Sequence, residues 1–350
     1  MRFLVVHPGP FFSVQDCYTG WVEGLRENGQ LVAQYNLGDR LLFYDAVVID
    51  TGEKLPDGQA DIRKALDSDQ AMQLAVNGLL SSCYQYWPDV VFIVSAFFVP
   101  TEMLDLIRAR GHKVVILHTE APYEDQRQLK LAPHADLNLL NDPTNIEAFE
   151  AIAPTVYSPH AYREHLHCPG PSDAKPSDLV FVGTGYPSRV EFFEAMDLDG
   201  LDVALAGNWL RLPEESPLRG YVVHDTDDCF ENEDAVPLYR AARAGINLYR
   251  REAQSDGLVN GWSCGPREIE LASAGCFFLR DPRPEGDHLF AMLPTFDGPG
   301  DASEKLRWYL ARDELRQDLA SQARAAVAER TFTNHAAQLL RLLDRQPANV

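Results

Sequence analysis

The residues best suited to chemistry lie in the segment from Gly265 to Gly275. Pro266 suits the first turn of a helix and Gly275 suits its end, so the segment predicts a short helix after a glycine-containing loop. On that helix Arg267 and Glu270 are three residues apart and share one face. The helix N-terminus could receive an anion while the charged pair binds a hydroxylated ring, and a nucleotide sugar presents both groups. An amphipathic helix with an ordinary ion pair is the alternative interpretation.

Composition and charge narrow the class of protein. With 350 residues, 45% of them hydrophobic and 24% charged, the chain is typical of a globular protein with two domains of ordinary size. The six cysteines form no CxxC pair, so the sequence predicts neither a zinc site nor a disulfide framework. The net charge of −21 disfavours a large nucleic-acid interface, because an acidic surface repels phosphate groups.

Two apolar segments bear on the location of the protein. Residues 1–8 form too short an apolar run for a signal peptide and predict a first core strand. The longest apolar run, residues 90–100, is too short to cross a bilayer. We therefore expect a cytoplasmic protein without membrane insertion.

The elements that must position the candidate residues alternate between strands and helices. This alternation predicts a parallel sheet with crossover helices in each half of the chain. In the first half, the strand-like runs are residues 3–6, 46–49, 90–95, 114–117 and 135–140, and the helical runs are 18–28, 62–80, 101–110 and 144–151. In the second half, the strands are 179–182, 203–206, 221–223, 246–249 and 276–279, and the helices begin at 188 and span 236–244, 303–311, 313–329 and 334–345.

A polar, proline-rich passage near residue 165 predicts the linker between two domains. The expected organisation is a first domain at 1–165, a second at 166–330 and a terminal helix within 331–350. The apolar positions of that helix have the spacing needed to pack back on the first domain. These positions are Ala336, Leu339, Leu340 and Leu343.

Two successive Rossmann-like halves joined by a linker resemble the GT-B glycosyltransferases. Residues 181–189 (FVGTGYPSR) resemble the first strand and loop of a donor domain of the glycosyltransferase family 1/4 type, and residues 207–209 resemble its later strand-end glycine. Residues 238–248 are similar to the segment before the donor helix. Glu270, followed five residues later by Gly275, matches the second glutamate of the E-x7-E element of that family.

The chain is similar in particular to the CgeB-like glycosyltransferases and to glycosyltransferases encoded by actinobacterial phages. The similarity rests on residues 7–10 with 20–23, and on residues 119–123 with 141–142. It makes a protein acceptor, such as a phage structural protein in the host cytoplasm, one of the acceptors to consider.

The resemblance implies a GT-B fold, in which two Rossmann-like α/β domains face a central cleft and the C-terminal helix crosses back to the first domain. The first domain would bind the acceptor, and the second would bind a UDP-, GDP- or dTDP-sugar donor. The implied reaction transfers the sugar to a hydroxyl group without a metal or a further cofactor. A nucleotide-sugar epimerase and a non-catalytic nucleotide-sugar-binding protein are alternatives. The second alternative stays open because Trp262 occupies the position of the first glutamate of E-x7-E.

The resemblance also implies roles for single residues in the donor site. Glu270 would accept hydrogen bonds from the ribose hydroxyls. Glycines after the first strand would let the backbone approach the diphosphate, two arginines would neutralise it, and N–H groups of residues 263–265 would bind the leaving phosphate. Each residue also has a purely structural interpretation. The implied donor-binding residues are Gly183, Thr184, Gly185, Arg189, Asn247, Gly265, Arg267 and Glu270.

The catalytic candidates lie in the first half. His7 ends the first strand, where parallel sheets place ligand-binding groups, and Asp16, His118 and Glu120 lie at comparable loop positions. One of the last three could deprotonate the acceptor if the reaction inverts the anomeric centre. If it retains configuration, no base is needed, and His118 would contact the donor sugar. His160 could also face the cleft.

Two Asp-x-Asp sequences, at residues 67–69 and 225–227, match the metal site of a different glycosyltransferase fold. Such short patterns are common in an acidic chain, so we interpret both as solvated charge and expect no metal site.

Overall fold

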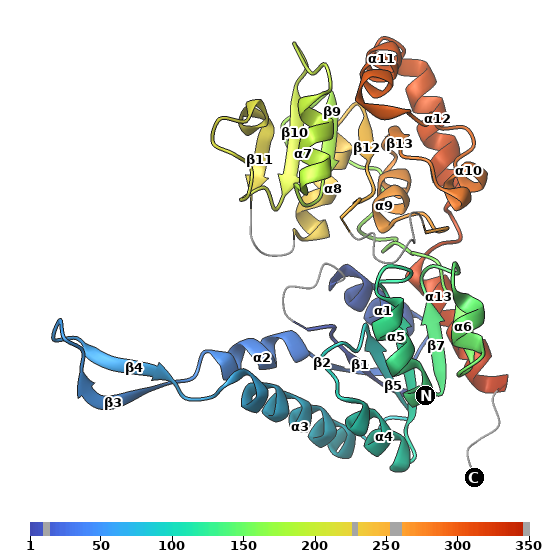
Figure 1. The fold of residues 1–350 in the computed structure, drawn as a ribbon. Coiled ribbons are helices and arrows are strands. Elements are labelled where there is room, and N and C mark those ends of the chain that lie inside the picture. Colours follow the sequence, from blue (N-terminus) through green and yellow to red (C-terminus); the bar gives the residue numbers. More distant parts are fainter. Residues whose placement is uncertain (10–14, 226–229, 253–260, 346–350) are drawn as a thin grey trace.

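Two parallel β-sheets, one in each half of the chain, form the framework of the protein (Figure 1). The computed structural model describes residues 1–9, 15–225, 230–252 and 261–345. The strand order is β2-β1-β5-β6-β7-β8 in the first sheet and β11-β10-β9-β12-β13 in the second. The predicted α/β fold with two Rossmann-like domains is therefore confirmed.

The bounds of the elements lie close to most of the predicted runs. The strands of the first sheet are β1 (Arg2–Val6), β2 (Leu31–Tyr35), β5 (Val90–Val94), β6 (Lys113–His118), β7 (Leu137–Leu140) and β8 (Thr155–Tyr157). The strands of the second sheet are β9 (Leu179–Val182), β10 (Val203–Gly207), β11 (Val222–Asp225), β12 (Gly245–Asn247) and β13 (Phe278–Arg280). The helices of the first half are α1 (Gln15–Glu27), α2 (Leu37–Asp45), α3 (Ser68–Tyr86), α4 (Thr101–Ala109), α5 (Asp125–Leu131) and α6 (Ile146–Glu150). The remaining helices are α7 (Pro187–Glu194), α8 (Asn232–Ala241), α9 (Pro266–Ala274), α10 (Pro284–Leu289), α11 (Gly298–Leu310), α12 (Asp313–Ala326) and α13 (Phe332–Arg345).

Strand β1, which pairs with β2 and β5, is buried on both faces. Phe3 and Val5 belong to a core with residues of α1 and α13, whereas Leu4 and Val6 belong to a core with residues of α2, α3 and α4. Successive side chains of a strand point to opposite faces, so helices on both sides must cover it. Strands covered in this way are continuous apolar runs, which is why this one is recognisable in the sequence.

The prediction of a core strand at 46–49 is wrong, and the helix predicted over 62–80 is present but shifted to 68–86. Strand β3 (Val48–Lys54) pairs antiparallel with β4 (Ala60–Lys64), and the two form a hairpin that projects from the first domain (Figure 1). The edge strand that pairs with β1 is β2. Its sequence, LVAQY, is partly polar, so the apolar pattern did not predict it as a strand. Helix α3 begins later than predicted because Asp67 caps it, accepting the Gln70 N–H in a capping box.

The chain crosses between the two domains twice, and the two crossings lie side by side. Tyr162 N–H donates to the Arg330 carbonyl at 3.0 Å, and Phe332 N–H donates to the Tyr162 carbonyl at 3.2 Å. These bonds surround a parallel bridge between Tyr162 and Thr331. The linker and the return of the chain are therefore fixed to each other.

After the second crossing, α13 packs on the first domain, as predicted. Leu339 is 1% exposed and shares a core with Trp21 of α1. A Cβ atom at Gly24 of α1 would lie 2.4 Å from the Phe332 carbonyl oxygen, so the close approach of the two helices requires a glycine there. Among the described residues, no helix is long and apolar enough to cross a membrane.

We predict that Leu339→Ala lowers the free energy of unfolding of the first domain by about 2–5 kcal/mol, because it leaves a cavity in a closed core. Chemical denaturation followed by tryptophan fluorescence measures the effect. Gln338→Ala, at an exposed position of the same helix, is the control and should change stability little. Equal stability of both variants would contradict docking of α13 on the first domain.

Candidate functional site

A cavity of about 410 Å³ lies between the two domains, at the carboxyl ends of strands from both sheets. Residues that follow β5, β6 and β8 line it from the first domain, and residues that follow β9, β10 and β12 line it from the second. Parallel sheets bind ligands at this edge, because the loops after the strands converge there. The start of α1, the start of α8 and the helix α9 also line it. The lining includes Asp16, Phe97, Glu120, Glu124, Arg127, His160, Gly183, Thr184, Asn232, Arg250, Arg267 and Glu270.

The helix α9 begins and ends where its sequence predicts. Gly265 is the N-cap, and the carboxylate of Glu268 accepts its N–H at 3.1 Å. Gly275 ends the helix with φ of 79°, a conformation that glycine adopts without strain. The helix is anchored at both ends, so the side chains on its cavity face have fixed positions.

Glu270 is a buried, ionised acceptor held by two donors. Arg267 Nη1 donates to Glu270 Oε2 at 2.7 Å and to the Tyr239 hydroxyl at 2.6 Å. Asn232 Nδ2 donates to Glu270 Oε1 at 3.2 Å. Burial opposes ionisation of Glu270, but the charge of Arg267 and the other partners outweigh it and hold its pKa below the ordinary value. The predicted pair on one face of the helix is therefore present and faces the cavity.

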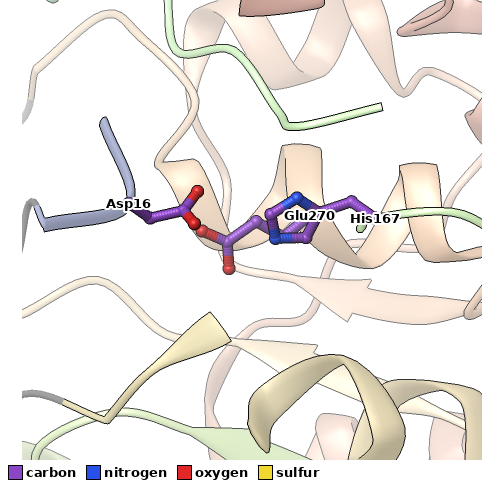
Figure 2. Close-up of side chains that lie close together, drawn as sticks. All are labelled: Asp16, His167 and Glu270. Atoms are coloured by element: carbon purple, nitrogen blue, oxygen red, sulfur yellow. The ribbon is translucent and has the colours of Figure 1, made fainter. Parts of the chain in front are cut away.

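Asp16 of α1 and His167, which lies between β8 and β9, meet Glu270 (Figure 2). One ligand atom of each of the three side chains lies within 4.8 Å of the other two. Arg163 holds two of them, because its Nη1 donates to Asp16 Oδ1 at 3.0 Å and its backbone N–H donates to His167 Nδ1 at 3.2 Å. Burial raises the pKa of Asp16. Two carboxylates and an imidazole could hold a divalent cation or hydroxyl groups.

Glu120 lines the cavity from the first domain. Its Oε2 accepts a hydrogen bond from Arg250 Nη2 of the second domain at 2.8 Å. Burial raises the pKa of Glu120 although Arg250 opposes the change. A carboxylate with a raised pKa suits proton transfer near neutral pH.

The predicted glycine loop contributes to the cavity only in part. Gly183 and Thr184 line it. Gly185 packs instead on Trp209, since a Cβ atom there would lie 2.5 Å from the indole ring. Close packing against Trp209 therefore gives a structural reason for a glycine at position 185.

Arg189 does not line this cavity. It supports the loop, since its guanidinium donates to the carbonyls of Thr184 at 3.0 Å and Leu248 at 2.6 Å. The guanidinium also lies over the Phe181 ring at 5.2 Å. Burial lowers the pKa of Arg189 to about 10. Its position outside the cavity does not support the predicted contact with the diphosphate.

His118 and Asn247 do not line the cavity either. His118 is 0% exposed, and its Nε2 lies 2.8 Å from Asn138 Oδ1. Burial lowers the pKa of His118 to about 4. Asn247 is buried at the end of β12, where its carbonyl accepts the Asp281 N–H. These positions do not support contact of either side chain with a substrate.

The predicted phosphate-binding N–H groups of residues 263–265 already donate to carboxylates of the protein. A phosphate at Gly265 would have to displace a buried acceptor, so these bonds do not support the role predicted for this residue. The bonds run from Ser263 N–H to Asp142 at 2.9 Å, from Cys264 N–H to Glu285 at 2.7 Å and from Gly265 N–H to Glu268 at 3.1 Å.

Trp262, at the position of the first glutamate of E-x7-E, does not line the cavity. Its ring lies edge-on to Tyr157 of the first domain at 5.8 Å. The backbone N–H of Trp262 donates to Thr144 Oγ1 at 3.1 Å. The position therefore serves contact between the domains.

A buried carboxylate joins the domains beside this contact. Glu285 Oε1 accepts from the Tyr157 hydroxyl at 2.9 Å and from Arg330 at 2.5 Å, and Oε2 accepts the Cys264 N–H. Glu285 is 3% exposed. The turn before α9 is thus fixed to the first sheet through one side chain.

Three residues of the site were not predicted. Arg250 follows a core strand in the second half. Parallel sheets place ligand-binding groups after the ends of their strands, and this argument, already applied to His7, could have identified Arg250. Asn232 begins α8 and carries no distinctive pattern. His167 lies in the linker, where no periodicity relates it to Asp16 or Glu270.

Glu268, next to the site, is fully buried. Its Oε2 accepts hydrogen bonds from the Tyr249 hydroxyl and the Gly265 N–H. Its Oε1 has no partner among the residues that the structure describes. Burial raises the pKa of Glu268 to about 7.

A protein-family model matches most of the second domain and part of α13. Residues 189–341 match the family model described as "Glycosyl transferase-like". The match includes Arg267 and Glu270. No curated protein matches this chain.

Solved structures with a similar fold include two sugar-phosphate synthases, a glucosyltransferase and a protein assigned as a UDP-N-acetylglucosamine 2-epimerase from Listeria monocytogenes. A sucrose-phosphate synthase from Thermosynechococcus elongatus is similar over 98% of this chain and 99% of that chain, with 14% identity and a TM-score of 0.64. The trehalose-6-phosphate synthase OtsA is similar over 99% and 100%, with 11% identity and a TM-score of 0.66. An alpha-glucosyltransferase in complex with UDP and a 13-mer DNA containing a HMU base is similar over 99% and 100%, with 12% identity and a TM-score of 0.61. At these identities the similarity shows the fold, which is GT-B.

We predict that Glu268 makes stability depend on pH. A carboxyl group whose pKa is raised by folding stabilises the protein fully below about pH 4.5, and this contribution is lost as the pH rises to about 7. Glu268→Gln keeps an acceptor and cannot ionise. The melting temperature of the wild type minus that of the variant should therefore fall between pH 5 and pH 8. Parallel pH profiles would show that Glu268 is ionised throughout this range.

Proposed function

We propose that this protein is a glycosyltransferase that moves a sugar from a nucleotide-diphospho-sugar donor to a hydroxyl acceptor. The observation that carries the proposal is the Arg267–Glu270 pair, which faces a cavity between the carboxyl ends of strands from two parallel sheets. Such a cavity can hold two ligands, one against each domain. The match of residues 189–341 to a glycosyltransferase family model supports the same reaction.

The donor would bind to the second domain. Glu270 is ionised and has a fixed orientation, so it suits acceptance of hydrogen bonds from ribose hydroxyls. Arg267 and Arg250 line the cavity and could neutralise the diphosphate. Their charges support transfer without a metal. Backbone of Gly183 and Thr184 lies at the same wall and would contact the phosphates.

The acceptor would bind to the first domain. If the reaction inverts the anomeric centre, Glu120 is the best-placed base, since it lines the cavity and burial raises its pKa. Its partner Arg250 could then move from the carboxylate to a donor phosphate, which would free the base. Retention of configuration would require no such group.

Charge favours an acceptor without phosphate groups. Glu120 and Glu124 line the acceptor side of the cavity, where Arg127 is the opposing charge. The net charge of the chain is −21. A protein or sugar hydroxyl fits this surface better than DNA, although one similar enzyme was solved with DNA. Intact-mass analysis of proteins incubated with the enzyme and donor would reveal added sugar.

We predict that Glu270→Ala weakens nucleotide binding at least about tenfold, because hydrogen bonds to a charged acceptor are lost, and strongly reduces sugar transfer. Calorimetry with UDP and GDP, and release of nucleotide from their sugars with and without an acceptor, measure both effects. Acceptor-dependent release indicates a transferase. Epimerisation without an acceptor would indicate an epimerase, and binding without turnover would indicate a binding protein.

Glu304→Ala is the matched control, since Glu304 is exposed on α11 outside the cavity. It should bind and turn over donor as the wild type does. Circular dichroism checks that both variants fold. Wild-type binding and turnover by Glu270→Ala would remove the proposed donor site.

A further inference from the structure

The hairpin of β3 and β4, residues 48–64, forms an arm that projects from the first domain (Figure 1). Its two strands form a sheet of their own. We infer that two copies of this chain form a dimer through this arm, by antiparallel pairing of β4 with β4 of the second copy. The inference is independent of the proposed function, because no residue of the arm lines the cavity.

The arm receives little support from the rest of the chain. None of its residues belongs to the hydrophobic cores of the part that the structure describes. Its large apolar side chains are instead between 43% and 59% exposed, and they are Val48, Ile49, Leu55 and Ile62. A single two-stranded hairpin is only marginally stable in water. Since no further strand among the described residues pairs with the arm, a stabilising strand must come from another molecule.

The outer edge of β4 offers backbone groups to such a strand. The Thr51 hydroxyl of β3 donates to the Asp61 carbonyl at 3.0 Å, so this carbonyl faces β3. Successive residues of an antiparallel strand direct their N–H and C=O groups to alternate edges, so those of Ile62 face outward. A further antiparallel strand can therefore pair with β4 about Ile62.

The sequence of β4, ADIRK, is complementary to itself in this arrangement. Ile62 lies opposite Ile62 of the second copy, and Asp61 of each copy lies opposite Arg63 of the other. Within one chain Arg63 already pairs with Asp61 at 2.6 Å, so the four charges alternate in sign on one face of the joined sheet. Apolar pairs and opposite charges across strands both stabilise a sheet. A second copy satisfies these pairs in both directions at once, as a two-fold axis requires.

The outer edge of β3 offers no comparable match. Pairing of β3 with itself about Thr51 would place Ile49 opposite Glu53 of the second copy. The register of the hairpin also shifts between Asp50 and Lys54. Irregularities of this kind end strand pairing. Strand addition is therefore limited to β4, which gives a closed dimer instead of a fibre.

Charge also favours the arm as the contact between two copies. The net charge of the chain is −21, so the bodies of two copies repel each other. Residues 48–64 carry three basic and four acidic side chains and are nearly neutral. Because the arm projects from the body, two arms can pair while the acidic surfaces stay apart (Figure 1).

Sedimentation velocity of the full-length protein at about 1–100 µM tests the inference. The wild type should sediment as a dimer at the upper concentrations. Ile62→Asp and Arg63→Asp should each weaken association at least about tenfold, because each puts like charges opposite each other on both sides of the two-fold axis. The double variant Asp61→Arg with Arg63→Asp exchanges the charges and should restore the dimer.

Leu31→Asp is the matched control. Leu31 is 70% exposed and begins β2, an edge strand of the first sheet. The substitution introduces the same charge at a different sheet edge, so it should leave the dimer intact. Circular dichroism checks that every variant is folded.

A cysteine cross-link tests the register. Residues directly opposite in a hydrogen-bonded antiparallel pair have Cα atoms about 5.5 Å apart, which is within the range of a disulfide bond. Ile62→Cys should therefore give a disulfide-linked dimer on a non-reducing gel after mild oxidation. Leu55→Cys, beyond the end of β3, should not. The wild type, with its six cysteines, gives the background.

The remaining outcomes each overturn the inference. A wild type that stays monomeric at every concentration leaves the arm to a different protein. Association that Ile62→Asp and Arg63→Asp do not weaken, or that Leu31→Asp abolishes, places the contact elsewhere. A double variant that stays monomeric, or equal cross-linking of the two cysteine variants, excludes antiparallel pairing about Ile62. Nucleotide binding remains measurable in every case, so the proposed function is tested separately.

Discussion

The buried carboxylate of Glu285 is a central contact between the two domains. It accepts hydrogen bonds from Tyr157 of the first sheet, from Arg330 of the second crossing and from the backbone before α9. A buried charge is stable only when it is paired and hydrogen-bonded, so these three segments must stay together. Their arrangement places Glu270 of α9 opposite Asp16 of α1, which no contact within either domain could achieve.

The fold was largely predictable because parallel strands covered on both faces are continuous apolar runs. Val90–Val94 is fully buried and is visible in the sequence as such. The edge strand Leu31–Tyr35 was missed because its partly exposed residues include polar ones. The hairpin at Val48–Lys54 misled the prediction for the opposite reason, since its apolar residues are exposed outside the core.

The site was predictable only where its residues share one element. Arg267 and Glu270 are neighbours on a helix, so their spacing revealed the pair. His167 and Asp16 reach that pair from the linker and from another domain, and only the tertiary structure relates them. The backbone N–H groups of Ser263 and Cys264 already donate to carboxylates that are distant in sequence. Local patterns cannot reveal such distant partners.

The return of α13 to the first domain affects the order in which the protein can form during synthesis. Ala336, Leu339 and Leu343 fill part of the first core beside Trp21, yet they are among the last described residues of the chain. The first domain is translated first but lacks this side of its core until these residues leave the ribosome. The nascent first domain must therefore expose an apolar surface while the second domain is made, and it is during this interval that the protein most needs protection from aggregation.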